Sequence, residues 1–199
     1  MAEIKSTMEK VMERLAAMDA VAAPEELQAD DKNREGMRLA AGWLRDEGTD
    51  LAAVLAAQPD NLRRYFQAGL VRTFLRNIVL PREVEQQRLA ELAMQGMLAI
   101  GGTDNELGAV FKELKAVLDR YLEHRQQLRQ QLAEHFAQQM GQMEQKLAAQ
   151  TGMAMKLQPE QHPKFQEEWL RVQEELNAQY GRALAQYKEL VQQRLGVIG

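Results

Sequence analysis

The chain lacks cysteine altogether and has a single serine, Ser6, among its 199 residues. Disulfide bonds, thiolate metal sites and a cysteine nucleophile are therefore excluded. Ser6 has no base near it in the sequence, so nothing supports a serine nucleophile. No apolar run approaches the roughly 18 residues that a membrane-spanning helix needs. The segment MAEIKSTMEKVMERL also lacks the apolar core of a signal peptide, so we expect a cytoplasmic protein without membrane contact.

Residues that favour strands are also scarce. Aromatic residues make up 6% of the chain, and Ala, Leu, Gln, Glu, Arg and Met dominate over the β-branched residues. These dominant residues lose little side-chain freedom in a helix. The five prolines stand at positions 24, 59, 81, 159 and 163, each where a helix is expected to begin or end. The composition therefore predicts an all-α fold.

Residue patterns that carry chemistry are missing as well. His124 and His135 lie three helical turns apart, about 16 Å along the axis, so one metal ion cannot join them. Adjacent carboxylates such as Glu167 and Glu168 diverge by about 100° around a helix and do not converge on one reacting atom. We therefore expect no catalytic residue, no metal site and no bound cofactor. The net charge of −4 argues against a strongly basic nucleic-acid-binding protein.

The N-terminal part is predicted to be a helix followed by a linker. Apolar residues recur at alternating steps of four and three along residues 1–18, a narrow stripe of the coiled-coil kind: Ile4, Met8, Val11, Leu15 and Met18. Pro24 and the acidic residues around it indicate a linker over residues 19–30. The stripe packs either on its own domain, which is the simpler interpretation, or on another subunit.

Residues 31–102 are predicted to form a compact helical domain. Asp50 is a suitable N-cap for a brief helix that Pro59 closes. The segment NLRRYFQAGLVRTFLRNIVL has apolar residues all around its axis, so we expect it to be the central helix. Pro81 is expected in the first turn of the next helix, with Val84 among the residues that point inward.

Residues 103–199 are predicted to form a long antiparallel helical hairpin of the coiled-coil kind. One helix runs from Asp104 to Gln150 and the other from Phe165 to Leu195. The apolar stripe is broad over residues 107–122, which suits docking on the compact domain, and thin over 128–147, which suits contact with one helix. The first helix of the chain and a homodimer partner are the two candidates to cover the remaining apolar surface.

The break between these helices, TGMAMKLQPEQHP over residues 151–163, forms the tip of the hairpin. Its apolar residues alternate with others as in an extended strand, which fits addition to a partner's sheet edge or groove. The alternative, which we take as the simpler interpretation, is that these side chains fold back over Phe165 and Trp169 at the start of the next helix. The candidate interaction tip comprises Met153, Met155, Leu157, His162, Phe165 and Trp169.

Five arginines form the strongest local bias towards an anionic partner, because no acid lies among them between Asp60 and Glu83. Spread around a helix axis, they do not make the contiguous basic face that a phosphate backbone needs. Nucleic acid is thus an alternative partner rather than the expected one. The candidate residues are Arg63, Arg64, Arg72, Arg76 and Arg82.

Four segments spread over nearly the whole chain carry a family resemblance: MAEIKSTMEKVMER, EGMRLAAGWL, LVRTFLRNIVLPR and QTGMAMKLQPEQHPKFQEEW. With them the chain resembles a family of uncharacterised bacterial proteins of unknown function. The resemblance implies a helical, cytoplasmic protein and assigns no activity, cofactor or site residue.

These features together favour a non-enzymatic adaptor, scaffold or assembly protein that self-associates, as a homodimer, and binds another protein through the projecting hairpin. Association with nucleic acid through residues 63–82 is the second hypothesis. An enzyme with an unrecognised pocket between the domains is the third.

Overall fold

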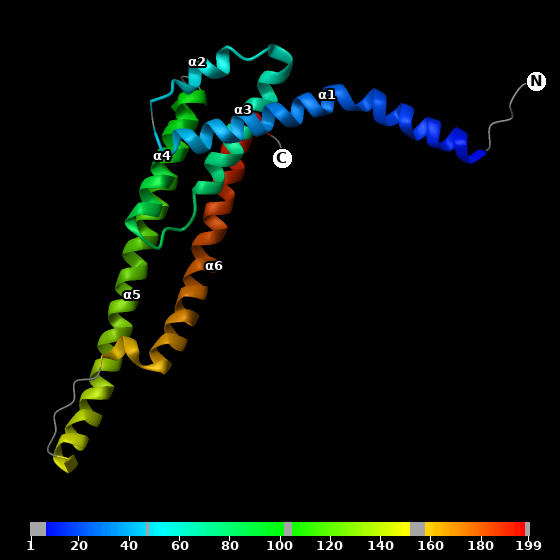
Figure 1. Ribbon diagram of the computed structural model, residues 1–199. Coiled ribbons are helices and arrows are strands. Elements are labelled where there is room, and N and C mark those ends of the chain that lie inside the picture. The colour runs from blue at the N-terminus through cyan, green and yellow to red at the C-terminus, as the bar shows by residue number, and fades with distance from the viewer. Residues whose placement is uncertain (1–6, 47, 102–104, 152–157, 198–199) are drawn as a thin grey trace, which may run out of the picture.

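The computed structural model describes residues 7–46, 48–101, 105–151 and 158–197, with side chains for 8, 26–46, 48–101, 106–141 and 158–197 (Figure 1). Over these ranges the chain forms six α-helices and one 3-10 turn and no strand. The prediction of an all-α fold is confirmed. The elements are α1 (Thr7–Trp43), α2 (Leu51–Ala56), α3 (Asp60–Asn77), α4 (Val84–Gly101), α5 (Asn105–Thr151), η1 (Pro159–Gln161) and α6 (Pro163–Arg194).

The expected linker over residues 19–30 is instead part of α1, which is continuous from Thr7 to Trp43. Pro24 lies inside this helix. A proline in a helix interior removes one backbone hydrogen bond but does not always end the helix. The residues that follow it, Glu25, Glu26 and Leu27, are good helix formers. The acidic residues and Pro24 therefore suggested the end of a helix, whereas the helix continues through them.

One hydrophobic core joins the compact domain to the hairpin. Phe66, Leu70 and Phe74 of α3 lie in it with Met97 of α4, all nearly inaccessible to solvent. The same cluster takes residues from both hairpin helices: Leu107, Phe111, Leu114 and Leu118 from α5, and Leu184 and Val191 from α6. The broad stripe thus packs into the core of the compact domain, as predicted, from Leu107 as far as Leu118. Residues 31–102 and the base of the hairpin share this core rather than each having its own.

Helices α1 and α3 cross at two glycines. A Cβ atom on Gly36 would overlap the carbonyl oxygen of Phe66 and lie 3.2 Å from the backbone nitrogen of Leu70. A Cβ atom on Gly69 would overlap the carbonyl oxygen of Asn33. Each glycine is therefore in contact with the backbone of the opposite helix. The crossing brings Trp43 against Phe74, with ring centroids 5.7 Å apart.

The elements between α1 and α5 follow local signals. Asp50 caps α2, since its side chain accepts a hydrogen bond from the Ala53 amide at 3.0 Å. Helix α4 begins at Val84, so Pro81 precedes the helix instead of lying in its first turn. Val84 is 78% exposed, which corrects the expectation that it points inward. It is the first residue of α4, and the first buried residue of this helix is Ala90, about two turns later.

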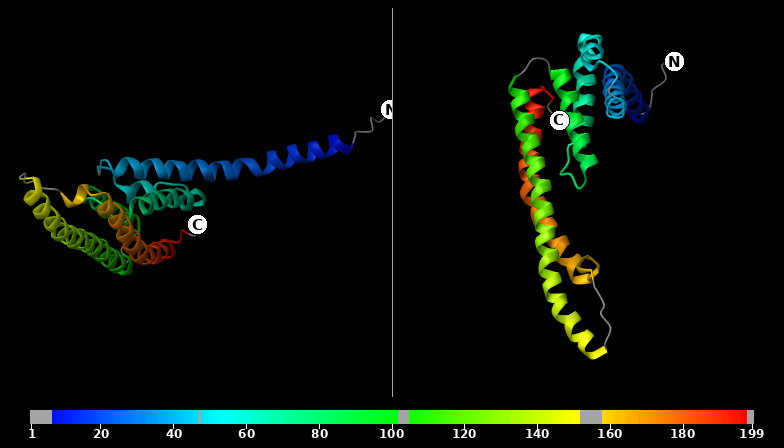
Figure 2. Two further views of the ribbon diagram at one scale, coloured as in Figure 1. Left: turned by 90° about the horizontal axis from the view of Figure 1, so that it is seen from below. Right: turned by 90° about the vertical axis from the view of Figure 1, so that its left-hand side faces the viewer.

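Helices α5 and α6 form the predicted antiparallel hairpin (Figures 1 and 2). Arg194 near the end of α6 pairs with Glu106 near the start of α5, and Phe165 near the start of α6 meets Phe136 far along α5. Gly196, with φ +65°, follows α6 in the left-handed conformation that glycine adopts without strain. Helix α5 is longer than α6 and extends past its start.

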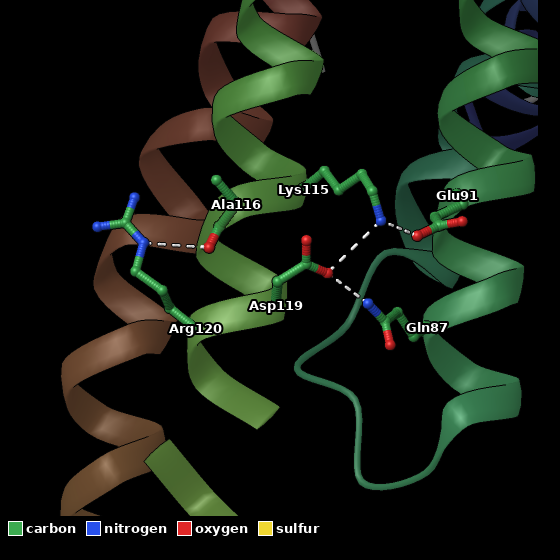
Figure 3. A network of polar contacts seen from close by, with 6 residues as sticks. All are labelled: Gln87, Glu91, Lys115, Ala116, Asp119 and Arg120. Atoms are coloured by element: carbon green, nitrogen blue, oxygen red, sulfur yellow. Dashed lines mark hydrogen bonds and ion pairs between the residues drawn. The ribbon is translucent and has the colours of Figure 1, made fainter. Parts of the chain in front are cut away.

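A polar network joins α4 to α5 on the surface (Figure 3). Lys115 pairs with Glu91 across the two helices and lies 3.5 Å from Asp119 one turn along. Gln87 donates a second interhelical hydrogen bond to Asp119. The hydrogen bond to Glu91 is the main cause that raises the pKa of Lys115 above its usual 10.5.

We expect the substitution Glu91→Gln to lower the free energy of unfolding by less than about 1 kcal/mol, because an exposed ion pair is screened by water and salt. A raised lysine pKa means that this stability is fully present below pH 10.5 and is lost as the pH rises through the higher folded-state value. Urea titrations of both proteins at pH 8 and above pH 11 measure the difference. A difference that grows with pH would contradict the role of charged Lys115.

Candidate interaction site on the distal hairpin

The start of α6 is defined by the residues that precede it. His162 is the N-cap, and its Nδ1 atom accepts a hydrogen bond from the Lys164 amide at 3.2 Å. Pro163 occupies the first helical position, where the missing amide hydrogen has no helical partner to lose. The turn η1 precedes this cap and packs against α5. These features direct α6 back along α5, so that Phe165 faces the hairpin partner.

A second, smaller hydrophobic cluster lies beyond the main core, between α5 and the start of α6. It consists of Phe136, Phe165 and Trp169, with exposures of 8%, 1% and 7%. The Phe136 and Phe165 rings meet edge to face, with centroids 5.5 Å apart. His162 adds a ring 5.9 Å from Phe136. We call residues 126–141 of α5 together with 158–173 the distal arm, and this cluster the arm cluster.

Arg125 ties the base of the arm to the compact domain. Its guanidinium lies 5.6 Å from the centre of the Trp169 ring, within the range of a cation–π contact. The same side chain donates a hydrogen bond to the backbone carbonyl of Arg82, in the loop between α3 and α4, at 3.1 Å. One side chain therefore connects α5, α6 and that loop, which limits bending of the arm at its base.

Tyr121 makes a buried polar contact between the hairpin helices. Its side chain is 2% exposed, and its hydroxyl donates a hydrogen bond to Asn177 Oδ1 at 2.7 Å. Tyr180 packs edge to face on Tyr121, with centroids 5.4 Å apart. Burial is the main cause that raises the pKa of Tyr121, so the neutral, hydrogen-bond-donating form is favoured.

We expect Tyr121→Phe to destabilise the protein by about 1 kcal/mol, because it leaves the Asn177 carbonyl without its donor. Tyr187→Phe is the matched control: that side chain also packs on the core, but its hydroxyl takes part in no hydrogen bond between described residues. Chemical denaturation of both variants measures the effect. Equal losses of unfolding free energy in the two variants would show that the hydrogen bond of Tyr121 to Asn177 does not stabilise the protein.

The surface of the arm is hollowed beside the arm cluster. The groove has a volume of about 530 Å³ and is open to solvent. Both helices line it, with apolar and charged side chains together: Leu132, His135, Phe136, Gln139, Lys164, Glu167 and Glu168. In the described part of the chain, no three His, Asp or Glu side chains are grouped so as to hold a metal ion. The described residues that line the groove include no hydroxyl or thiol nucleophile.

The residues predicted for the tip fall into two groups. Met153, Met155 and Leu157 lie outside the described residues. Phe165 and Trp169 are buried against α5 and so are not presented to a partner in this structure. His162 is partly exposed, but it serves as the cap of α6. The groove beside these rings is open to solvent, whereas the rings themselves are buried.

The structure does not bring the five predicted arginines together on one surface. Arg63 is directed to the start of its own helix, where it pairs with Asp60 at 2.8 Å and donates to the Gln58 carbonyl. Arg82 belongs to the loop that Arg125 holds. The other three are Arg64, Arg72 and Arg76, which are all exposed on α3. No ion pair between described residues includes any of these three arginines.

The groove residues His135, Gln139, Lys164, Glu167 and Glu168 were missed from the sequence. They are polar residues on two helices that are distant along the chain, and no local pattern distinguishes them from an ordinary solvated face. The available signal was Phe136, the largest residue of the thin stripe. Its partner across the hairpin could be named only once the register of α5 against α6 was known.

Comparison with known proteins adds a family but no activity. A family model described as "Family of unknown function (DUF6657)" matches residues 52–193. The match runs from α2 almost to the end of α6, so it includes most of the main core and the distal arm and begins after α1. Neither a curated protein nor a solved structure matches the chain. None of the described helices is long and apolar enough to cross a membrane. Because the matched range is well over half of its length, the chain belongs to this family of unknown function.

Proposed function

We propose that this protein is a cytoplasmic, non-enzymatic adaptor or assembly factor, and that it binds another protein through the distal arm. The observation that carries this proposal is the arm cluster. It stabilises a part of the hairpin that extends past α1, α2, α3 and α4 and adds nothing to their shared core (Figure 1). The last residue of α5 that belongs to this core is Leu118, so the core does not need the part of α5 that lies beyond it.

The construction of the arm supports a binding role. Its two helices are held together by three buried aromatic rings and fixed at the base by Arg125. A partner therefore meets a surface that loses little conformational freedom on binding, which favours affinity. The groove combines an aromatic wall with charged residues of both signs, Lys164, Glu167 and Glu168. Protein-binding surfaces commonly combine an apolar centre with a polar rim.

Site-specific photo-crosslinking in the native host tests the proposal. A photoreactive phenylalanine analogue replaces exposed Glu168 of the groove in one protein and exposed Gln95 of α4 in a control. We expect a discrete heterologous adduct from position 168, suppressed by excess unlabelled wild-type protein, and none from position 95. Adducts of equal yield at both positions, or none at position 168, would overturn the proposal.

The same experiment shows whether the tip takes part. Unlabelled protein carrying Met153→Asp, Met155→Asp and Leu157→Asp is added as the competitor in place of wild type. If it competes equally well, the groove is the binding surface and the tip is not. If it fails to compete, the tip belongs to the surface.

The exposed side of α3 favours a second candidate, association with nucleic acid. Arg64 and Arg76 are twelve positions apart, about 18 Å along the helix axis, with Arg72 between them. A gel-shift titration at increasing salt tests this candidate, because contacts to phosphates weaken steeply with ionic strength. Absence of binding at low salt removes it.

A further inference from the structure

Helix α1 is much longer than its contact with the rest of the molecule. Its packing residues lie in the C-terminal half, where Asn33 and Gly36 meet α3 and Trp43 meets Phe74. Towards the N-terminus, Gln28 still borders a small hollow with Asn61 of α3. Before that point α1 leads away from the body, as Figure 1 and the left view of Figure 2 show. Met8, near its start, is 78% exposed.

The seven-residue spacing of two α1 positions that pack on α3 continues in the sequence of this projecting half. Gly36 and Trp43 are seven residues apart and both are buried in the crossing with α3. The same seven-residue step, followed towards the N-terminus, meets Ala29, Ala22, Leu15 and Met8 in the sequence. Val11 and Met18 follow Met8 and Leu15 by three residues, whereas the equivalent positions nearer the crossing are Glu25 and Lys32. A repeat of this kind, with apolar residues at alternating steps of four and three, is the pattern of a coiled coil.

Residue size changes along this repeat in step with the structure. Gly36 stands where the backbone of α3 approaches closely, and the next two positions towards the N-terminus are Ala29 and Ala22. Beyond Ala22, where α1 leads away from the body, the positions are methionine, leucine and valine. A helical segment of this length is marginal in water unless an apolar face is packed. The large residues therefore call for a second helix at ordinary packing distance.

We propose that the N-terminal half of α1 pairs with the same segment of a second copy of this chain, in a parallel two-stranded coiled coil. Its seven-residue spacing is continuous with that of the α1 positions at the crossing with α3, and a second copy offers the same apolar positions. In the parallel register Arg14 and Asp19 occupy the flanking positions that face each other between the two copies. In an antiparallel pair centred on the same stripe, Arg14 of one chain would instead lie near Arg14 of the other chain. This inference concerns α1 and does not depend on the function of the arm.

The first test is the mass of the full-length protein in solution. We expect light scattering and sedimentation to give a dimer for wild type, and Val11→Lys with Leu15→Lys to weaken dimerisation by at least about 100-fold, roughly 2.8 kcal/mol. Leu27→Lys is the matched control, since Leu27 is 60% exposed on the opposite side of α1, and it should remain dimeric. Near-ultraviolet circular dichroism of Trp43 and Trp169 verifies that the body is folded. A monomeric wild type, or a dimer unaffected by the lysines, would overturn the proposal.

The second test uses the lack of cysteine in the chain. With Met18→Cys, mild oxidation should join two copies by a disulfide, because equivalent positions of a parallel pair come within the short distance that a disulfide spans. Leu27→Cys should not crosslink. An antiparallel pair would separate the two introduced sulfur atoms by more than a helical turn, so a dimer without this crosslink would refute the parallel arrangement.

Discussion

Replacing Gly36 or Gly69 by alanine is expected to destabilise the protein by about 3 kcal/mol, a large fraction of the stability of an ordinary domain. A Cβ atom at either position would overlap a carbonyl oxygen of the opposite helix. Backbone atoms cannot rotate out of the way as side chains do, so α1 and α3 must separate. Alanine gains about 1 kcal/mol of helix propensity over glycine, which offsets only part of the loss.

Gly181→Ala is the control for this prediction. Gly181 lies inside α6, and a Cβ atom there has no neighbour within 4 Å. The propensity gain should therefore appear alone, as a stabilisation of up to about 1 kcal/mol. Urea denaturation of the three variants measures the sign and size of each change. A stabilised Gly36→Ala protein would show that the two helices do not touch at this point.

The double variant Gly36→Ala, Gly69→Ala adds a sharper test. Both glycines lie at one crossing, so separating the helices for the first Cβ atom also makes room for the second. The combined loss should be clearly smaller than the sum of the single losses. Gly36→Ala with Gly181→Ala should be additive, because these sites share no neighbour. Additivity at the crossing would mean that the glycines act separately.

Local signals accounted for most of the helices. Asp50 and Pro59 delimit α2 through a cap and a break that involve only neighbouring residues. The repeated steps of three and four along residues 165–195 indicated α6 because helical periodicity needs no knowledge of the partner. The same reasoning failed at Pro24, where a residue that usually ends helices is accommodated inside one.

Contacts between distant segments were beyond the reach of the sequence. Gly36 and Gly69 each count against helix formation, and nothing local shows that the two are opposed at a close crossing. The residues of the candidate site could not be predicted for the same reason, because they too depend on contacts between distant segments. Phe165 and Trp169 were recognised as large apolar residues near the tip, yet their burial depends on where α6 meets Phe136. That register is set by the length and path of the connection between the helices, which periodicity does not encode.

The arm cluster carries the second large expected effect. Phe136→Ala should cost the distal arm about 3–4 kcal/mol, because it removes a buried ring and leaves a cavity between Phe165 and His162. The loss should be local. Hydrogen exchange should show reduced protection for residues 163–176 of α6, while α3 and α4 keep theirs, since the arm cluster and the main core share no buried residue.

Leu170→Ala provides the comparison for the arm, because Leu170 follows Trp169 directly but is 59% exposed and should change stability by less than about 0.5 kcal/mol. If Phe136→Ala lowers protection equally in α3, the arm and the body unfold as one unit and the arm cluster is only an extension of the core. If protection falls in the arm alone, the cluster stabilises a separate structural unit. Maintaining such a unit beyond a complete core gives the molecule no additional core stability, which is why we attribute to it a role in contact with another protein.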